Sequence, residues 1–271
     1  CDLSIDFGVI MENYKVGFIG YGNMAKAIAK SLHATGYADK IYASDVNKNA
    51  ADSSVIMLES NADVINKSDF VFLSVKPQAA ADALAGLDFA GKTVISIMAG
   101  TDLAALTGMC RGTDKIVRVM PNLCARVGKA VNAYCPSGLD DNEELVVERF
   151  LSAFGMPAKL EESYFDTITG LTGSSPAYTF RYAKALTECG VKHGLSFERS
   201  RDLTLYCIAA CMDVLASADS LKDMQTTIDN VCSKGGTTIE GIYKLDEGHF
   251  DEVVISAVDA AIRRSAELGR K

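Results

Sequence analysis

The stretch that decides the fold is Lys15-Val-Gly-Phe-Ile-Gly-Tyr-Gly-Asn-Met-Ala25. Its first five residues form a short apolar run of the kind found in buried strands. After its glycines, Met24, Ile28 and Leu32 recur at helical spacing. Gly36 follows as a typical C-terminal stop for a helix. The stretch therefore predicts a strand, a glycine turn and a helix.

The glycine turn has the spacing of a dinucleotide-binding fingerprint. A pyrophosphate is held by backbone N–H groups at a helix N-terminus, and a Cβ at the closest approach would obstruct that contact. Gly20 and Gly22 supply the clearance, and Ala25 suits the close packing required at the third position. A glycine-rich corner without a ligand is the alternative, but the strand before it and the helix after it favour dinucleotide binding. We expect these turn residues to contact the dinucleotide: Ile19, Gly20, Tyr21, Gly22, Asn23 and Met24.

Strands and helices continue to alternate along the N-terminal part of the chain. Further strands are expected at 40–44, 69–75, 93–98, 115–120 and 131–134. The segment 55–58 is expected to be helical or a short buried piece, and a helix is expected around 144–154. This alternation indicates a parallel sheet with right-handed crossovers, which is a Rossmann-like domain.

From about residue 162 onward the sequence shows only helical periodicity. Leu203, Cys207 and Val214, for example, share one helix face. The prediction is an α/β chain with a Rossmann-like dinucleotide-binding domain at 11–162 and an all-helical domain at 163–271. Met11 is expected to be the natural start.

Composition excludes several classes of function. The chain has 27 Lys and Arg against 35 Asp and Glu, a net charge of −8, which disfavours a nucleic-acid partner. The longest stretch without a charged residue, 167–180, is shorter than the roughly 20 apolar residues of a membrane span. The three histidines have no second ligand at metal spacing, so no metal is expected. Eight cysteines without paired CxxC motifs fit a reducing cytoplasm.

The end of the second strand is expected to contact the ribose 2′ position. Asp45 follows Gly20 at a distance typical of the fingerprint, and an acidic residue there bonds a 2′-hydroxyl and repels a 2′-phosphate. Taken alone, Asp45 favours NADH. Ser44, Asn47 and Lys48 would still hold a phosphate if Asp45 turned outward, and a solvated aspartate in a surface loop is a further alternative. The choice between NADH and NADPH stays open at this point.

A second glycine pair, Gly235-Gly236, lies just before a predicted helix. Thr237 followed by Glu240 has the pattern of a capping box. Free N–H groups at such a helix start, with no side chain above them, form a receptor for a small anion such as a carboxylate. A flexible turn before a capped helix is the alternative.

Stretches along the whole chain resemble the pyrroline-5-carboxylate reductases. The similar stretches are Gly17-Phe-Ile-Gly-Tyr-Gly-Asn-Met-Ala25, Ser74-Val-Lys-Pro77, Met120-Pro-Asn122, Gly170-Leu-Thr-Gly-Ser-Ser-Pro-Ala-Tyr178 and the segment from Asn230 to Asp246. They occur in the family's order between about Val16 and Leu268. The resemblance therefore covers the whole protein.

The resemblance implies a reaction and its residues. The family reduces the C=N bond of L-1-pyrroline-5-carboxylate to give L-proline, usually with NADPH, and its helical domain pairs in a homodimer or a larger homo-oligomer. The Thr238 hydroxyl is then the group that polarises the imine nitrogen. The implied substrate-binding residues are Asn230, Ser233, Gly236, Thr237 and Thr238. Beyond Ser44 and Asp45, the resemblance adds the cofactor-binding residues Asn61, Val75, Lys76, Pro77, Ala99 and Gly100.

The sequence departs from the family at three places. Lys234 replaces the usual Pro before the two glycines, and Leu123-Cys124 replace the usual Thr-Pro after Met-Pro-Asn. Asp45 stands where many members carry neutral or basic residues. Two alternatives are another imine or β-hydroxyacid dehydrogenase of the same architecture, and a non-catalytic dinucleotide sensor. The Gly-Gly-Thr-Thr turn speaks against both.

Overall fold

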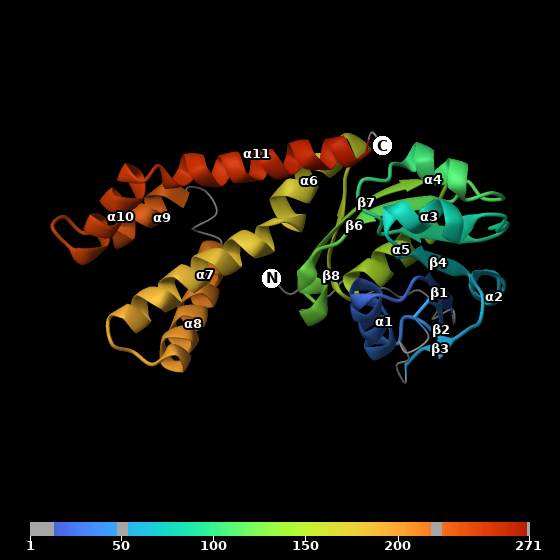
Figure 1. The fold of residues 1–271 in the computed structure, drawn as a ribbon, viewed down its shortest axis with the longest axis horizontal. Coiled ribbons are helices and arrows are strands. Elements are labelled where there is room, and N and C mark those ends of the chain that lie inside the picture. The colour runs from blue at the N-terminus through green and yellow to red at the C-terminus, as the bar shows by residue number, and fades with distance from the viewer. Residues whose placement is uncertain (1–13, 48–53, 218–223, 270–271) are drawn as a thin grey trace. The chain divides into compact units, whose positions relative to one another are not determined.

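The computed structural model describes residues 14–47, 54–217 and 224–269 (Figure 1). The expected start at Met11 lies outside these ranges, and so does Lys48, one of the three residues in the alternative in which Asp45 turns outward. The chain divides into two compact units, one made of residues up to 173 together with those from 262 onward, and the other of residues 174–261. The division into domains at 11–162 and 163–271 stays a prediction.

The first unit is built on a sheet. Among the described residues its strands follow the order β3-β2-β1-β4-β5-β6-β7-β8. The expected strands are confirmed as β1 (Lys15–Ile19), β2 (Lys40–Ser44), β4 (Phe70–Leu73), β5 (Thr93–Ser96), β6 (Ile116–Met120) and β7 (Ala130–Ser137). The strands from β3 to β6 run parallel, as expected for a Rossmann-like fold.

Three features of the sheet differ from expectation. The segment 55–58 is not helical, because Ile56–Met57 form the short strand β3 beside β2. Strand β7 is antiparallel to β6, since only the short helix η2 (Leu123–Val127) connects them and no crossover helix intervenes. Strand β8 (Gly155–Lys159) was not expected. It contains Pro157, which an edge strand tolerates because it needs fewer ladder donors.

Helices cover both faces of the sheet. Along each strand the side chains alternate between two apolar clusters, so Phe18 and Phe72 lie in one and Ile19 and Leu73 in the other. The rings of Phe18 and Phe72 stack with centroids 4.8 Å apart. Each such buried side chain contributes about 1.5–3 kcal/mol to folding.

The helices divide between these two clusters. The first cluster is covered by α1 (Asn23–Thr35) and α5 (Asp141–Ser152), and the second by α2 (Asn61–Lys67), α3 (Pro77–Leu84) and α4 (Leu103–Met109). The expected apolar positions Ile28 and Leu32 of α1 are fully buried. As expected, α1 ends at Gly36, which has φ +68°. This three-layer arrangement places the carboxyl ends of the parallel strands at one edge.

Helical structure continues from residue 162, as the periodicity predicted. The elements are η3 (Glu162–Tyr164), α6 (Phe165–Ile168), the π-helical turn η4 (Thr169–Gly173), α7 (Ser175–Lys192), α8 (Phe197–Leu215), α9 (Met224–Val231), α10 (Thr237–Glu247) and α11 (Phe250–Gly269). In the second unit α7 and α8 pack closely where Gly190 meets Ser200. The absence of a side chain on Gly190 permits this approach, since a Cβ there would collide with Ser200. The Ser200 hydroxyl donates to Thr187 O at 2.8 Å.

Many apolar side chains of the second unit are exposed in the single chain. They include Leu203 and Tyr206 on α8, Val231 on α9 and Val254 on α11. Tyr206 is 80% exposed. Within the described ranges no helix is both long and apolar enough to cross a bilayer.

Candidate active site

The residues expected to bind the dinucleotide lie at the carboxyl edge of the parallel sheet. Ile19 on β1 is in register with Ser44 on β2 and Leu73 on β4, and Leu73 is in register with Ser96 on β5. The segments that follow these strands therefore begin side by side. In open α/β sheets ligands bind outside this edge.

The two glycines of the turn have different roles. Gly20 has φ +85°, and a Cβ there would lie 2.9 Å from Val75 Cγ1 and 3.0 Å from the Ser74 backbone, so Gly20 lets the turn pack on the end of β4. Gly22 is the N-cap of α1, and a Cβ at Gly22 would meet no atom within 4 Å. The first turn of α1 therefore opens onto free space, which fits a dinucleotide phosphate.

Ser74 holds the turn in place, although the sequence reasoning did not include it among the site residues. Its hydroxyl lies 2.6 Å from Gly20 O and 3.2 Å from Ile19 O, within reach to donate to either carbonyl. Its N–H donates to Ile19 O at 2.9 Å. A small hydroxyl residue directly after a buried strand is the sequence signal that would have found it.

Asp45 points toward the glycine turn. Its Oδ2 accepts from Tyr21 N at 2.6 Å, and its Oδ1 accepts from Asn47 N at 2.7 Å. The alternative in which Asp45 turns outward is therefore not the observed arrangement. The carboxylate is half-buried, next to the turn expected to hold the pyrophosphate.

Ser44 and Asn61 form a second polar contact at the end of β2. The Ser44 hydroxyl donates to Asn61 Oδ1 at 2.6 Å, and Asn61 Nδ2 donates to Ala83 O at 2.8 Å. The N-cap of α2 is Ser60, which accepts from Asp63 N, so Asn61 is not the cap. The Asn61 amide instead joins β2 to the last turn of α3 and orients the Ser44 hydroxyl.

The remaining expected cofactor residues follow β4 and β5. Lys76 is the exposed N-cap of α3, and Pro77 is its first residue, where a missing N–H costs nothing. Gly100 has φ +70° in the loop after β5, and Ala99 beside it is exposed. The structure thus brings the expected cofactor residues of β1, β2, β4 and β5 to one edge. Their contacts with a dinucleotide stay a proposal.

The residues expected to bind substrate lie in the second unit, in the turn before α10. Gly236 N donates to Ser233 O at 2.9 Å, and Gly235 has φ +72°. This is the pattern of a type II β-turn, which needs glycine at its third position and favours proline at its second, where Lys234 stands. A Cβ on Gly236 would collide with Ser233 Oγ. The positive φ favours glycine at position 235, and a side chain at position 236 would displace the Ser233 hydroxyl.

The expected capping box at Thr237 is wrong. The N-cap of α10 is Gly236, with φ −84° and ψ 171°, and Thr237 is already the first helical residue. The turn places Gly236, in an extended conformation, at the N-cap of α10. The helix therefore begins at Thr237, one residue earlier than expected. A glycine cap has no side chain to bond the first N–H groups, which leaves the helix start available to an anion.

Thr238 occupies the second position of α10 and is exposed. Asn230, in the last turn of α9, is exposed as well. The structure therefore brings Ser233, Gly236 and Thr237 together around one helix start, with Thr238 next in the chain. Their roles toward a substrate stay a proposal.

Two further observations concern metal ligands and one buried thiol. No group of three His, Cys, Asp or Glu side chains in the described ranges is arranged to hold a metal ion. Burial raises the pKa of the Cys110 thiol to about 11, which keeps this thiol protonated at neutral pH.

Comparison with known proteins connects both units to one family. Residues 162–268 match a protein family described as "Pyrroline-5-carboxylate reductase dimerisation". Residues 15–100 match a second family, described as "NADP oxidoreductase coenzyme F420-dependent". A pyrroline-5-carboxylate reductase of Glycine max is 36% identical over 97% of this chain and 98% of its own length. One of Methanosarcina acetivorans is 34% identical over 96% of this chain and 100% of its own length.

A solved structure gives the same result. The crystal structure of Plasmodium falciparum pyrroline carboxylate reductase with NADP bound has a TM-score of 0.89 and 30% identity, and it covers 96% of this chain and 100% of that one. Sequence and fold agree over nearly the whole length. The chain therefore belongs to the pyrroline-5-carboxylate reductase family.

Proposed function

We propose that this chain reduces L-1-pyrroline-5-carboxylate to L-proline with NADPH or NADH, with NADPH as the default cofactor of the family. The observation that carries the proposal is the N-cap of α10 at Gly236, which has no side chain to bond the first N–H groups of the helix. These N–H groups would bind an anion close to the Thr238 hydroxyl. A cyclic imine with a carboxylate beside its C=N bond needs these two groups close together.

The dinucleotide is assigned to the first unit. Its pyrophosphate fits over Gly22 at the start of α1, where Asn23 and Met24 supply the first helical N–H groups. Asp45 and Ser44 lie at the end of β2, where the ribose of the adenosine half belongs. When bound, the reduced nicotinamide supplies a hydride to the imine carbon.

The substrate carboxylate is assigned to the start of α10. The Gly236 N–H is already donated to Ser233 O, so we assign the carboxylate to the N–H groups of Thr237 and Thr238 and to the Ser233 hydroxyl. The positive end of the α10 dipole adds to this attraction. Gly236 contributes by carrying no side chain into this space.

Thr238 is assigned to the imine nitrogen. A threonine hydroxyl is too weak an acid to release its proton freely at neutral pH, so its role is to orient and polarise the nitrogen through a hydrogen bond. Water or an already protonated iminium supplies the proton. Asn230 is the further candidate for orienting the substrate.

The direct test is product identification. Purified protein is incubated with L-1-pyrroline-5-carboxylate and either NADPH or NADH, and amino-acid chromatography follows the appearance of proline. We expect proline in amounts equal to the dinucleotide oxidised. Absence of proline with both cofactors would overturn the proposal.

We also propose that two copies of this chain form a homodimer through the helical region. The partners of the chain are then a second copy and the small-molecule substrate. The exposed apolar side chains Leu203, Tyr206, Val231 and Val254 support the homodimer, because one chain leaves them in water. The match of residues 162–268 to the dimerisation family supports it as well. Sedimentation equilibrium should give at least twice the chain mass, and a monomer at micromolar concentration would contradict it.

A cytoplasmic location and the lack of a nucleic-acid partner complete the proposal. The seven cysteines within the described ranges carry free thiols, which supports a reducing compartment. The net charge of −8 weighs against phosphate-backbone binding.

A further inference from the structure

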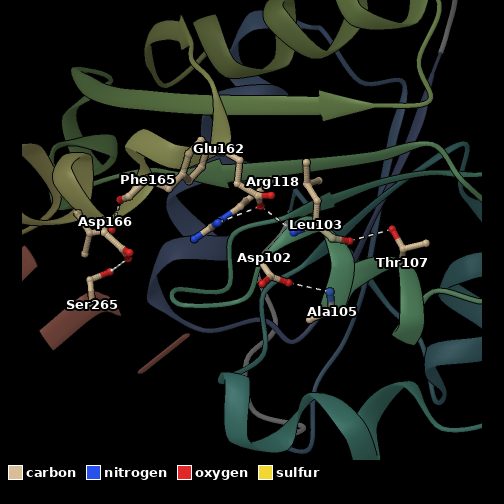
Figure 2. Close-up of polar contacts among 10 residues, drawn as sticks. Asp102, Leu103, Ala105, Thr107, Arg118, Glu162, Phe165, Asp166 and Ser265 are labelled. Carbon is tan, nitrogen blue, oxygen red and sulfur yellow. Dashed lines mark hydrogen bonds and ion pairs between the residues drawn. The ribbon is translucent and has the colours of Figure 1, made fainter. Parts of the chain in front are cut away.

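A buried cation lies on strand β6 of the first unit. The Arg118 side chain, on β6, is only 10% exposed. Its Nη1 donates to Glu162 Oε1 at 2.9 Å, and its guanidinium carbon lies 4.5 Å from the centre of the Phe165 ring (Figure 2). A buried charge requires such partners, because its desolvation is costly. Glu162 therefore joins the start of η3 to the middle of the sheet.

The same oxygen of Glu162 also accepts a hydrogen bond from the start of α4. Its Oε1 accepts from the backbone N–H of Leu103 at 2.7 Å, and Leu103 is the first residue of α4. Asp102, the N-cap of α4, accepts from Ala105 N at 2.7 Å. Figure 2 shows both bonds at this helix start. Glu162 thus caps α4 from a segment far along the chain, and its negative charge suits the positive end of the helix.

The loop before α4 is the one that carries two expected cofactor residues, Ala99 and Gly100. Glu162 holds its C-terminal side through Leu103. The end of α11 packs beside Gly100, since a Cβ there would lie 3.4 Å from Leu268 Cβ, at van der Waals distance. Gly100, Arg118 and Glu162 are among the residues that line a cavity of about 380 Å³.

The end of α11 is itself fixed. The Ser265 hydroxyl donates to Asp166 Oδ1 at 2.6 Å, and Asp166 follows Phe165 in α6 (Figure 2). The segment 162–166 therefore contacts both neighbours of the loop: Glu162 bonds the start of α4, and Asp166 bonds α11. This segment is the only part of the described first unit that we find bonded to β6, to α4 and to α11 by side chains.

We propose that Glu162 is a positioning residue for the dinucleotide: through the Leu103 N–H, its carboxylate fixes the loop at Ala99 and Gly100 in the conformation that receives the nicotinamide half. The inference rests on the proposed function for the identity of the cofactor. Glu162 acts through the backbone of another segment and is not assigned any contact with the substrate.

The sharpest test removes the Leu103 N–H and compares the result with a variant that changes only the side chain. Leu103→Pro deletes the donor at the first position of a helix, where proline is favoured, and Asp102 before it is extended as proline requires (φ −81°, ψ 170°). Leu103→Ala is the matched control, because it shortens the side chain and keeps the N–H. The Arg118–Glu162 pair stays intact in both.

The dissociation constant for NADPH is measured by fluorescence titration of the homogeneous protein without substrate. We expect Leu103→Pro to weaken NADPH binding about three- to tenfold relative to Leu103→Ala. This is less than the full effect of one charge-assisted hydrogen bond, because the lost bond lies within the protein and acts on the dinucleotide only through the loop. Equal dissociation constants for the two variants would overturn the proposal. Failure of the wild type to reduce the imine would count against the proposed function and leave this comparison valid.

Glu162→Gln tests the same hydrogen bond by changing its acceptor. Its amide keeps the shape and one acceptor but loses the charge, and Glu161→Gln is the control, since Glu161 is exposed one residue earlier. We expect Glu162→Gln to raise the KM for NADPH, leaving kcat and the KM for the imine within about twofold. Combining it with Leu103→Pro should add little, because both changes act on the same bond, which the first weakens and the second removes. Full additivity, or an equal effect on all kinetic constants, would contradict positioning.

Discussion

The Asp45 carboxylate accepts a hydrogen bond of 2.6 Å from the backbone N–H of Tyr21. This bond joins the end of β2, to which we assign the ribose of the adenosine half, to the turn to which we assign the pyrophosphate. On this assignment a negative charge lies on the side where NADPH carries its 2′-phosphate. We therefore propose that Asp45 both supports the turn and determines cofactor choice.

Replacing Asp45 by Asn should shift the cofactor preference toward NADPH. The amide oxygen can still accept from Tyr21 N, while the repulsion of the phosphate is removed. We expect the ratio of kcat/KM for NADPH to that for NADH to rise about tenfold at low ionic strength. Asp39→Asn, at an exposed acidic residue before β2, is the control. An unchanged ratio would show that Asp45 does not determine cofactor choice.

Thr238→Ala should lower kcat and leave NADPH affinity nearly intact. The change removes the hydroxyl assigned to the imine nitrogen and keeps the backbone N–H groups assigned to the carboxylate. A loss of about 100-fold in kcat is expected for a positioned donor. Thr238→Ser should recover most of it, because it restores the hydroxyl. Equal losses in kcat and in NADPH binding would make Thr238 structural.

Ser74→Ala should destabilise the glycine turn. The mutant loses the hydroxyl that contacts Gly20 O at 2.6 Å and Ile19 O at 3.2 Å, which costs about 1 kcal/mol in the free energy of unfolding. Urea unfolding at fixed protein concentration measures this, and NADPH titration should show weaker binding. Ser152→Ala is the comparison, since its hydroxyl bonds Arg149 O at an exposed helix end. Equal effects of the two substitutions would refute a special role for Ser74.

Lys234→Pro should stabilise the protein. Lys234 occupies the second position of the turn between Ser233 and Gly236, where proline fixes φ at the value that the turn requires. A gain of about 0.4–1 kcal/mol in the free energy of unfolding is expected, because proline restricts the unfolded chain. Lys244→Pro, inside α10, should instead be strongly destabilising. Destabilisation by Lys234→Pro would contradict the type II assignment.

Local pattern was sufficient where one segment determines its own conformation. The strand, turn and helix around Gly20 and Gly22 follow from residues within one stretch of sequence, and so does the helix stop at Gly36. The bond from Tyr21 to Asp45 was foreseeable in outline, because the spacing of the fingerprint places an acid at the end of the second strand.

Features set by distant partners were not predictable in this way. Strand β8 contains Gly155 and Pro157, which have low strand propensity, and it forms because β7 offers a free edge. The start of α10 at Thr237 depends on the turn at Gly235, so the capping-box pattern was misleading. The bond from Leu103 to Glu162 joins segments that only the folded chain brings together.

The central claim is that the start of α10 holds the substrate carboxylate beside Thr238 while the first unit supplies the dinucleotide. The most direct measurement is the steady-state oxidation of NADPH, followed by absorbance, with L-1-pyrroline-5-carboxylate and with 1-pyrroline, which lacks the carboxylate. We predict rapid oxidation with the first and a kcat/KM at least about 100-fold lower with the second, since the anion receptor is then left unused. Equal rates with the two imines, or no oxidation with either, would contradict the account.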